Sequence, residues 1–151
     1  MSHSREARSA LASIQKSKSQ KWIGWTLYGN QNTLPSGETI TEAFNFISDL
    51  KCDAYLINCG GANLITEAIK ELKSLTNERI GGYGNSEKIE ISHEDRSDRP
   101  EEDHWVSATP INEKEYAKEA QIWVEEGASI VAGCCRTRPS HIAEIVKTFN
   151  V

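Results

Sequence analysis

The chain has 151 residues, of which 38% are hydrophobic and 26% are charged, a balance typical of a globular protein. Its net charge of −5 leaves no basic surface for nucleic acid or an anionic membrane, and no apolar run reaches the roughly 18 residues of a membrane span. Residues 1–20 are polar and lack the apolar core of a signal peptide. We therefore expect a cytoplasmic protein whose four cysteines are thiols or metal ligands.

Amphipathic helices and short apolar strands alternate along the chain. Helices are indicated by apolar residues three and four apart, and strands by runs of strand-forming residues bounded by glycine, proline and polar loops. In chain order, the pattern predicts a helix over 4–18, a strand over 22–28, a helix over 41–50, a strand over 54–59, a helix over 64–75, a strand over 79–83, a helix over 112–126, a strand over 129–135 and a helix from 137.

Details at the ends of these elements carry further expectations. Gly60 and Gly61 are expected to end the second strand. Asn112 and Glu115 form an N-terminal capping signature. The final helix is expected to bury one apolar face, made of Ile142, Ile145, Val146 and Phe149.

Residues 84–111 interrupt the alternation. They are polar, rich in Asp and Glu, and contain Pro100 and Pro110. The segment is too long for an ordinary connection between two elements, which predicts a functional lid or a mobile segment.

The alternation predicts parallel strands joined by right-handed crossovers, and hence an α/β fold. No strand is followed by a G-x-G-x-x-G sequence or a P-loop, which disfavours the nucleotide-binding versions of such folds. An α/β sheet or part of a (β/α)8 barrel remains. Four strand–helix units correspond to half of a complete barrel, which takes about 250 residues.

Three cysteines end two of the predicted strands. Cys59 ends the second strand, and Cys134 and Cys135 end the fourth. Sites in parallel α/β folds collect at these strand ends. Three thiolates suit zinc and leave a fourth tetrahedral position open, as in catalytic zinc sites. Adjacent strand residues point to opposite faces, so both members of the pair reach one metal only if the strand stops there, which Gly133 favours.

The structural alternative is that such cysteines are small buried hydrophobes, which is the ordinary role of a lone cysteine and the one expected for Cys52. The histidines are expected in loops or at the surface, although the position of His141 at the start of the last helix also admits metal ligation. The four histidines are His3, His93, His104 and His141.

Three segments resemble the homocysteine S-methyltransferases: INC at 57–59, YGNS at 83–86 and AGCCRTRPSHI at 132–142. The last is similar to that family's Gly-Gly-Cys-Cys signature with its trailing Thr-x-Pro-x-His-Ile, although Ala132 stands in place of the first glycine. The resemblance covers essentially the whole chain, yet it matches only the second half of the family's barrel.

The resemblance implies a single domain over 1–151 that is half of a (β/α)8 TIM-type barrel, with four parallel strands alternating with helices. It implies that Cys59, Cys134 and Cys135 hold a catalytic zinc and that homocysteine, bound through its sulfur, accepts a methyl group and becomes methionine. Asn58, Tyr83 and Asn85 are the expected substrate-binding or orienting residues.

A half barrel leaves two strand edges open, here 22–28 and 129–134, and exposed edges favour pairing with another chain. We therefore expect a truncated or split chain that forms a homodimer or pairs with an N-terminal half. Two alternatives stay open at this point: a catalytically silent zinc-binding half barrel, and a redox-active protein that uses the adjacent thiols.

Overall fold

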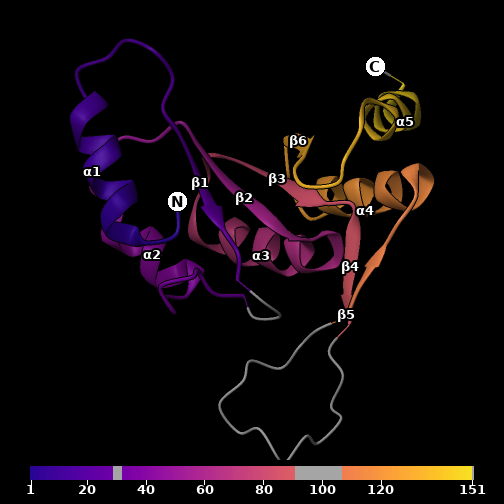
Figure 1. Ribbon diagram of the computed structural model, residues 1–151. Coiled ribbons are helices and arrows are strands. Elements are labelled where there is room, and N and C mark those ends of the chain that lie inside the picture. The colour runs from indigo at the N-terminus through magenta and orange to yellow at the C-terminus, as the bar shows by residue number, and fades with distance from the viewer. Residues whose placement is uncertain (29–31, 91–106, 151) are drawn as a thin grey trace, which may run out of the picture.

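Four parallel strands form the central sheet in the order β1–β2–β3–β6, as the alternation of elements predicts. The computed structural model describes residues 1–28, 32–90 and 107–150 (Figure 1). The elements are α1 (Ser4–Ile14), β1 (Trp22–Thr26), α2 (Ile40–Ile47), β2 (Ala54–Gly61), α3 (Ala62–Leu75), β3 (Arg79–Asn85), β4 (Glu87–Glu90), β5 (Ser107–Pro110), α4 (Glu113–Glu125), β6 (Ile130–Gly133) and α5 (Pro139–Phe149).

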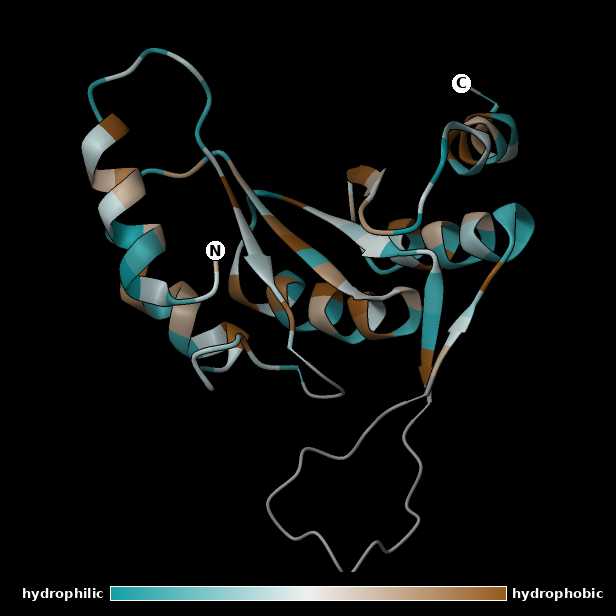
Figure 2. Ribbon diagram, viewed as in Figure 1, coloured by the Kyte–Doolittle hydropathy of each residue, from teal (hydrophilic) through white to brown (hydrophobic). Residues whose placement is uncertain are grey.

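The hydrophobic core lies between this sheet and the helices that cover one of its faces. Strand residues such as Trp25 and Ile57 pack there against Ile65 and Ile69 of α3 and Trp123 of α4, all of them buried. Figure 2 shows the corresponding hydrophobic colouring along β2 and on the helices beside it. Burial of each large apolar side chain contributes about 1.5–3 kcal/mol, so this layer supplies most of the stabilisation.

Local sequence signals set several helix starts. The side chain of Asn112 accepts hydrogen bonds from the first turn of α4, and Glu115 completes the predicted capping box. Thr39 and Glu42 form a second capping box at the start of α2. Because these side chains satisfy main-chain N–H groups that lack helical partners, they fix where each helix begins.

The structure corrects two expectations about strands. The second strand does not stop at Cys59: β2 includes Gly60 and ends at Gly61, which pairs with Asn85 after a register shift. The polar segment 84–111 contains β4 and β5, an antiparallel pair that the sequence analysis did not predict. Their alternating polar side chains give little strand signal, and the pairing itself stabilises them. Residues 91–106 of that segment lie outside the described residues.

The last helix differs from its expected packing. Ile145 is buried, but Ile142 and Val146 are 39% and 43% exposed, so the predicted apolar face is only partly covered. His141, expected in a loop or at the surface, is buried against Tyr116, with ring centroids 5.7 Å apart. Helical spacing predicts which residues share a face, whereas contact with α4 decides which of them are covered.

Strands β1 and β6 are the two edges of the sheet, as predicted for a half barrel. Main-chain groups of Met1 partly occupy the β1 edge: its amino group donates to the Gly24 carbonyl at 2.7 Å, and its carbonyl accepts from Thr26 N at 2.9 Å. Within the described ranges, no helix has both the length and the apolar character needed to cross a membrane.

Candidate metal centre

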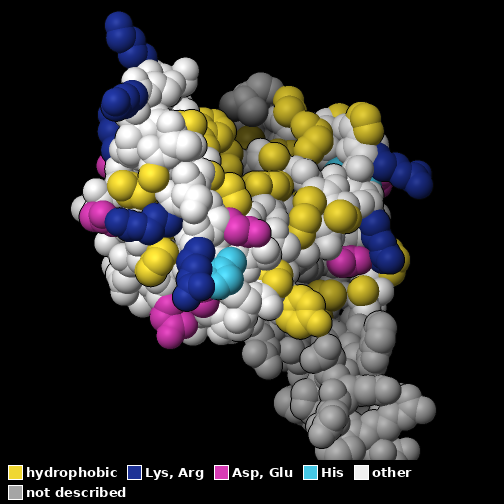
Figure 3. All heavy atoms as spheres, turned by 60° about the vertical axis from the view of Figure 1, so that its left-hand side comes forward, with side chains coloured by type: hydrophobic (Ala, Val, Ile, Leu, Met, Phe, Trp, Pro, Cys, Tyr) yellow, Lys and Arg dark blue, Asp and Glu magenta, His cyan; other side chains and the backbone are white. Residues whose placement is uncertain are grey.

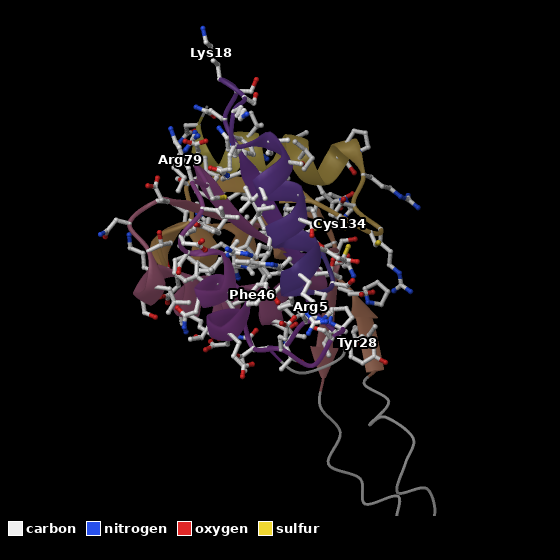
Figure 4. The ribbon with its side chains drawn as sticks, turned by 90° about the vertical axis from the view of Figure 1, so that its left-hand side faces the viewer. Arg5, Lys18, Tyr28, Phe46, Arg79 and Cys134 are labelled. Atoms are coloured by element: carbon white, nitrogen blue, oxygen red, sulfur yellow. The ribbon has the colours of Figure 1, made fainter. Side chains whose placement is uncertain are left out.

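The three predicted cysteines meet at one end of the sheet. The sulfur atoms of Cys59, Cys134 and Cys135 all lie within 4.8 Å of one another, and those of Cys59 and Cys134 are 2.7 Å apart. All three are free thiols, and Cys135 is exposed to solvent. Cys134 is labelled in Figure 4, where yellow marks sulfur.

Two irregular backbone segments bring these thiols together. Cys59 has a left-handed backbone with φ of 56° at the register shift between β2 and β3. β6 ends at Gly133, so Cys134 and Cys135 lie in a turn, and Arg136 follows with φ of 63°. Left-handed backbone is unfavourable for residues other than glycine, so it persists only where surrounding contacts hold it. The fourth strand was expected to run to Cys135, but it ends two residues earlier, at Gly133, where a break lets both thiols approach one metal position.

The turn after β6 is stabilised by Thr137. Its hydroxyl donates to the Cys134 carbonyl at 2.6 Å, and its main-chain N–H reaches the same carbonyl at 3.3 Å. A Cβ atom at Gly133 would collide with the Thr137 side chain. Glycine is therefore required at 133 because the turn folds back directly over it.

Asn85 joins the two irregular segments. Its side-chain Nδ2 donates to the Cys59 carbonyl at 3.2 Å and to Glu87 Oε1 at 3.0 Å, while its Oδ1 accepts from Cys135 N at 3.0 Å. Asn85 is 8% exposed. Both amide hydrogens are thus used within the protein, which favours the orienting role over substrate contact for this residue.

Glu87 and Arg136 extend this network, and the sequence analysis identified neither. Arg136 Nη1 lies 2.9 Å from Glu87 Oε2. Glu87 lies in the polar segment, where no spacing distinguishes it from the acidic residues nearby. The position of Arg136 directly after Cys135 was the one available signal.

Asn58 and Tyr83 lie in a polar row on the inner face of the sheet, opposite the helices. Asn58 Nδ2 donates to Tyr83 Oη at 2.6 Å, and Asn58 Oδ1 accepts from the Thr26 hydroxyl at 2.9 Å. Burial raises the pKa of Tyr83 and the nearby thiols add to this effect, while the bond from Asn58 opposes it. The row thus carries a neutral phenol near the cysteines.

Burial, together with the neighbouring Cys134 and Cys135 thiols, raises the pKa of the Cys59 thiol to about 12. Without a cation, Cys59 is therefore protonated at neutral pH. A divalent metal would displace this proton, since cysteine ligates metals as the thiolate.

The chemistry of the donor set fits zinc, which accepts soft sulfur ligands in tetrahedral sites. His141 is not part of the cluster. Cys52 is buried elsewhere, with its sulfur 3.2 Å from the Ala54 carbonyl, which agrees with a structural role. Three protein ligands would leave one tetrahedral position of a zinc ion open.

The comparisons with known proteins point to one family. The family model described as Homocysteine S-methyltransferase matches residues 1–149. Homocysteine S-methyltransferase 2 of Arabidopsis thaliana is 28% identical over 141 residues, a region covering 91% of this chain and 40% of that protein. Selenocysteine Se-methyltransferase of Brassica oleracea var. italica is also 28% identical, over 91% of this chain and 38% of its own length.

Solved structures show the same fold. The oxidized form of the homocysteine methyltransferase MmuM from Escherichia coli superposes with a TM-score of 0.72 at 21% identity, covering 97% of this chain and 42% of that one. Its metallated form gives a TM-score of 0.71 at 20% identity, covering 96% and 41%. The chain thus spans about two fifths of the length of the curated relatives it matches. On the match of the family model to nearly its whole length, this chain belongs to the homocysteine S-methyltransferase family.

Proposed function

We propose that this chain carries the zinc centre of a thiol methyltransferase, and that homocysteine binds there through its sulfur and receives a methyl group to give methionine. The observation that carries the proposal is the cluster of Cys59, Cys134 and Cys135, whose sulfur atoms lie within 4.8 Å of one another. Membership of the family supplies the substrate and the reaction.

When bound, zinc supplies the activation of the thiol, because a thiol that coordinates it loses its proton at neutral pH. The chain's own residues hold and orient this centre. Asn85 fixes the Cys59 carbonyl relative to the Cys135 N–H, so that the ligands from two strands keep one geometry. Tyr83 and Asn58, which are bonded to each other at 2.6 Å, are the residues proposed to contact substrate.

The proposed domain is one (β/α)8 half barrel over the whole chain, acting with a second barrel half. The open edges of the sheet support this. Within the described residues, the edge strands β1 and β6 each pair with a strand on one side only. Figure 3 shows several exposed hydrophobic side chains, with a few acidic groups among them, on the face that it presents. A second copy of the chain, or an N-terminal half, is the proposed partner. A thiolate centre also favours the reducing cytoplasm.

Metal analysis under reducing conditions tests the zinc centre. We expect about one zinc per chain in the purified protein and its loss from Cys134→Ser, with Cys52→Ala as the matched control because Cys52 lies outside the cluster. A wild-type protein that binds no zinc when it is supplied would refute the centre and favour the redox-active alternative.

Methyl transfer is tested separately. Zinc-loaded protein is assayed for methionine formation from homocysteine with S-methylmethionine, S-adenosylmethionine or betaine, alone and with a supplied N-terminal half of a family member. Zinc binding without turnover in any of these arms would establish the silent half barrel instead.

Sedimentation of the protein as a monomer at high concentration would contradict the homodimer.

A further inference from the structure

A cavity of about 450 Å³ lies beside the metal centre, between the segments that follow β3 and β6. Its lining combines polar and apolar side chains and contains two arginines, although none of the three clustered cysteines takes part. The side chains that matter here are Ser86, Glu113, Arg136, Thr137, Arg138 and His141.

Two of these side chains are buried and keep an unused hydrogen-bond donor. Ser86 is 3% exposed, and its main chain is bonded to Cys135 O and Ile111 N, but its hydroxyl has no partner within the described ranges. The hydroxyl lines the cavity and is not enclosed by protein, so its hydrogen is available to water or to a ligand that enters.

His141 is the second such side chain, at 6% exposure. Its Nδ1 accepts from Arg138 N at 3.1 Å, which places the ring hydrogen on Nε2. Among residues 1–28, 32–90 and 107–150, that Nε2 has no hydrogen-bond partner. Ser86 and His141 both line the cavity, one in the segment that follows β3 and one in α5, and each keeps a hydrogen-bond donor without a partner among the described residues.

The charges in the lining point to an anion of low charge. Arg136 is paired with Glu87, whereas Arg138 forms no ion pair with any residue that the structure describes. Glu113 accepts from the Ser140 hydroxyl at 2.9 Å, so its carboxylate is held by α5 and still opposes a negative ligand. One available guanidinium and two neutral donors match a single oxyanion group.

The position in the fold supports the same ligand. Parallel (β/α)8 proteins frequently bind phosphate with the loops that follow their last two strands. Here β3 and β6 are the last two strands of the parallel sheet, and the cavity lies between the segments that follow them.

We propose that this cavity binds the oxyanion group of a small molecule, a phosphate or a carboxylate, through Arg138, His141 and Ser86. The proposal goes beyond the methyltransferase function and does not depend on zinc. The site borders the metal loop, because Ser86 N donates to Cys135 O at 3.2 Å and Thr137 forms part of both structures.

Isothermal titration of the full chain with inorganic phosphate, and separately with acetate, tests the proposal and distinguishes the two sources. Binding with a dissociation constant on the order of 1 mM is expected for at least one of them. Phosphate alone indicates a phosphate ester, acetate alone indicates a carboxylate, and both indicate a general oxyanion site. Failure of both anions to bind at about 10 mM would overturn the proposal.

Two variants should change anion binding in opposite directions, and a third serves as the control. Arg138→Gln should weaken binding about tenfold because it removes a charged donor, and Glu113→Gln should strengthen it several-fold because it removes an opposing charge. Arg5→Gln is the matched control, an exposed arginine on α1 away from the cavity, and should leave binding unchanged. Binding that Arg138→Gln leaves intact, or that Glu113→Gln weakens, would assign it to another place on the protein.

Discussion

Replacing Asn85 with alanine tests how the metal ligands are held. The change removes the bonds to the Cys59 carbonyl, the Cys135 N–H and Glu87. At about 1 kcal/mol for each bond, the free energy of unfolding should fall by about 3 kcal/mol. Groups that orient metal ligands typically change metal affinity by about 10–100-fold, so zinc should bind more weakly by that factor.

The measurement is a competition for zinc between the protein and a chromophoric chelator under reducing conditions, together with urea unfolding of the metal-free protein. Asn63→Ala is the matched control. The Asn63 side chain makes two bonds of 2.9 Å to the main chain of Ile89, away from the cysteine cluster. This variant should lose about 2 kcal/mol of stability and keep its zinc affinity. An Asn85→Ala protein with reduced stability and unchanged zinc affinity would refute the orienting role.

Three further outcomes are expected. Zinc affinity should increase from about pH 6 to about pH 8, because the raised pKa of Cys59 means that binding releases a proton; an affinity constant across this range, measured by the same competition, would contradict it. Tyr116→Phe should lower the free energy of unfolding by about 1–2 kcal/mol, because the buried hydroxyl bonds the Gly84 and Ala132 carbonyls at 2.8 and 2.9 Å; an unchanged urea midpoint would show that the hydroxyl contributes nothing. Burial acts to raise the pKa of Glu38, but hydrogen bonds, chiefly from Ser4, outweigh it and lower that pKa below 4.5, so the bonded carboxylate adds stability above this pH that is lost as pH falls through the lowered value. Glu38→Gln should therefore destabilise the protein at neutral pH and lose this effect in acid, and an equal effect at both pH values in thermal unfolding would refute the linkage.

Local patterns in the sequence were enough to predict the parallel sheet, the helices that alternate with its strands, and the three thiols, but not the antiparallel pair β4–β5. These features depend on residues close together in the chain. Helical and alternating spacing marks which segments become helices and strands, and a cysteine at the end of a parallel strand lies at the same sheet edge as others like it. Gly133 favours a break in the fourth strand, although the strand was predicted to run to Cys135 and ends at Gly133.

The tertiary structure decided what holds those thiols in place. Asn85 bridges Cys59 and Cys135 only because β3 lies between β2 and β6, and no spacing in the sequence expresses that contact. The left-handed backbone at Cys59 likewise depends on neighbours from another strand. His141 shows the same limit, since its burial results from packing against α4. Local patterns determine which chemical groups reach the end of the sheet, whereas contacts between distant segments determine their geometry and their solvent exposure.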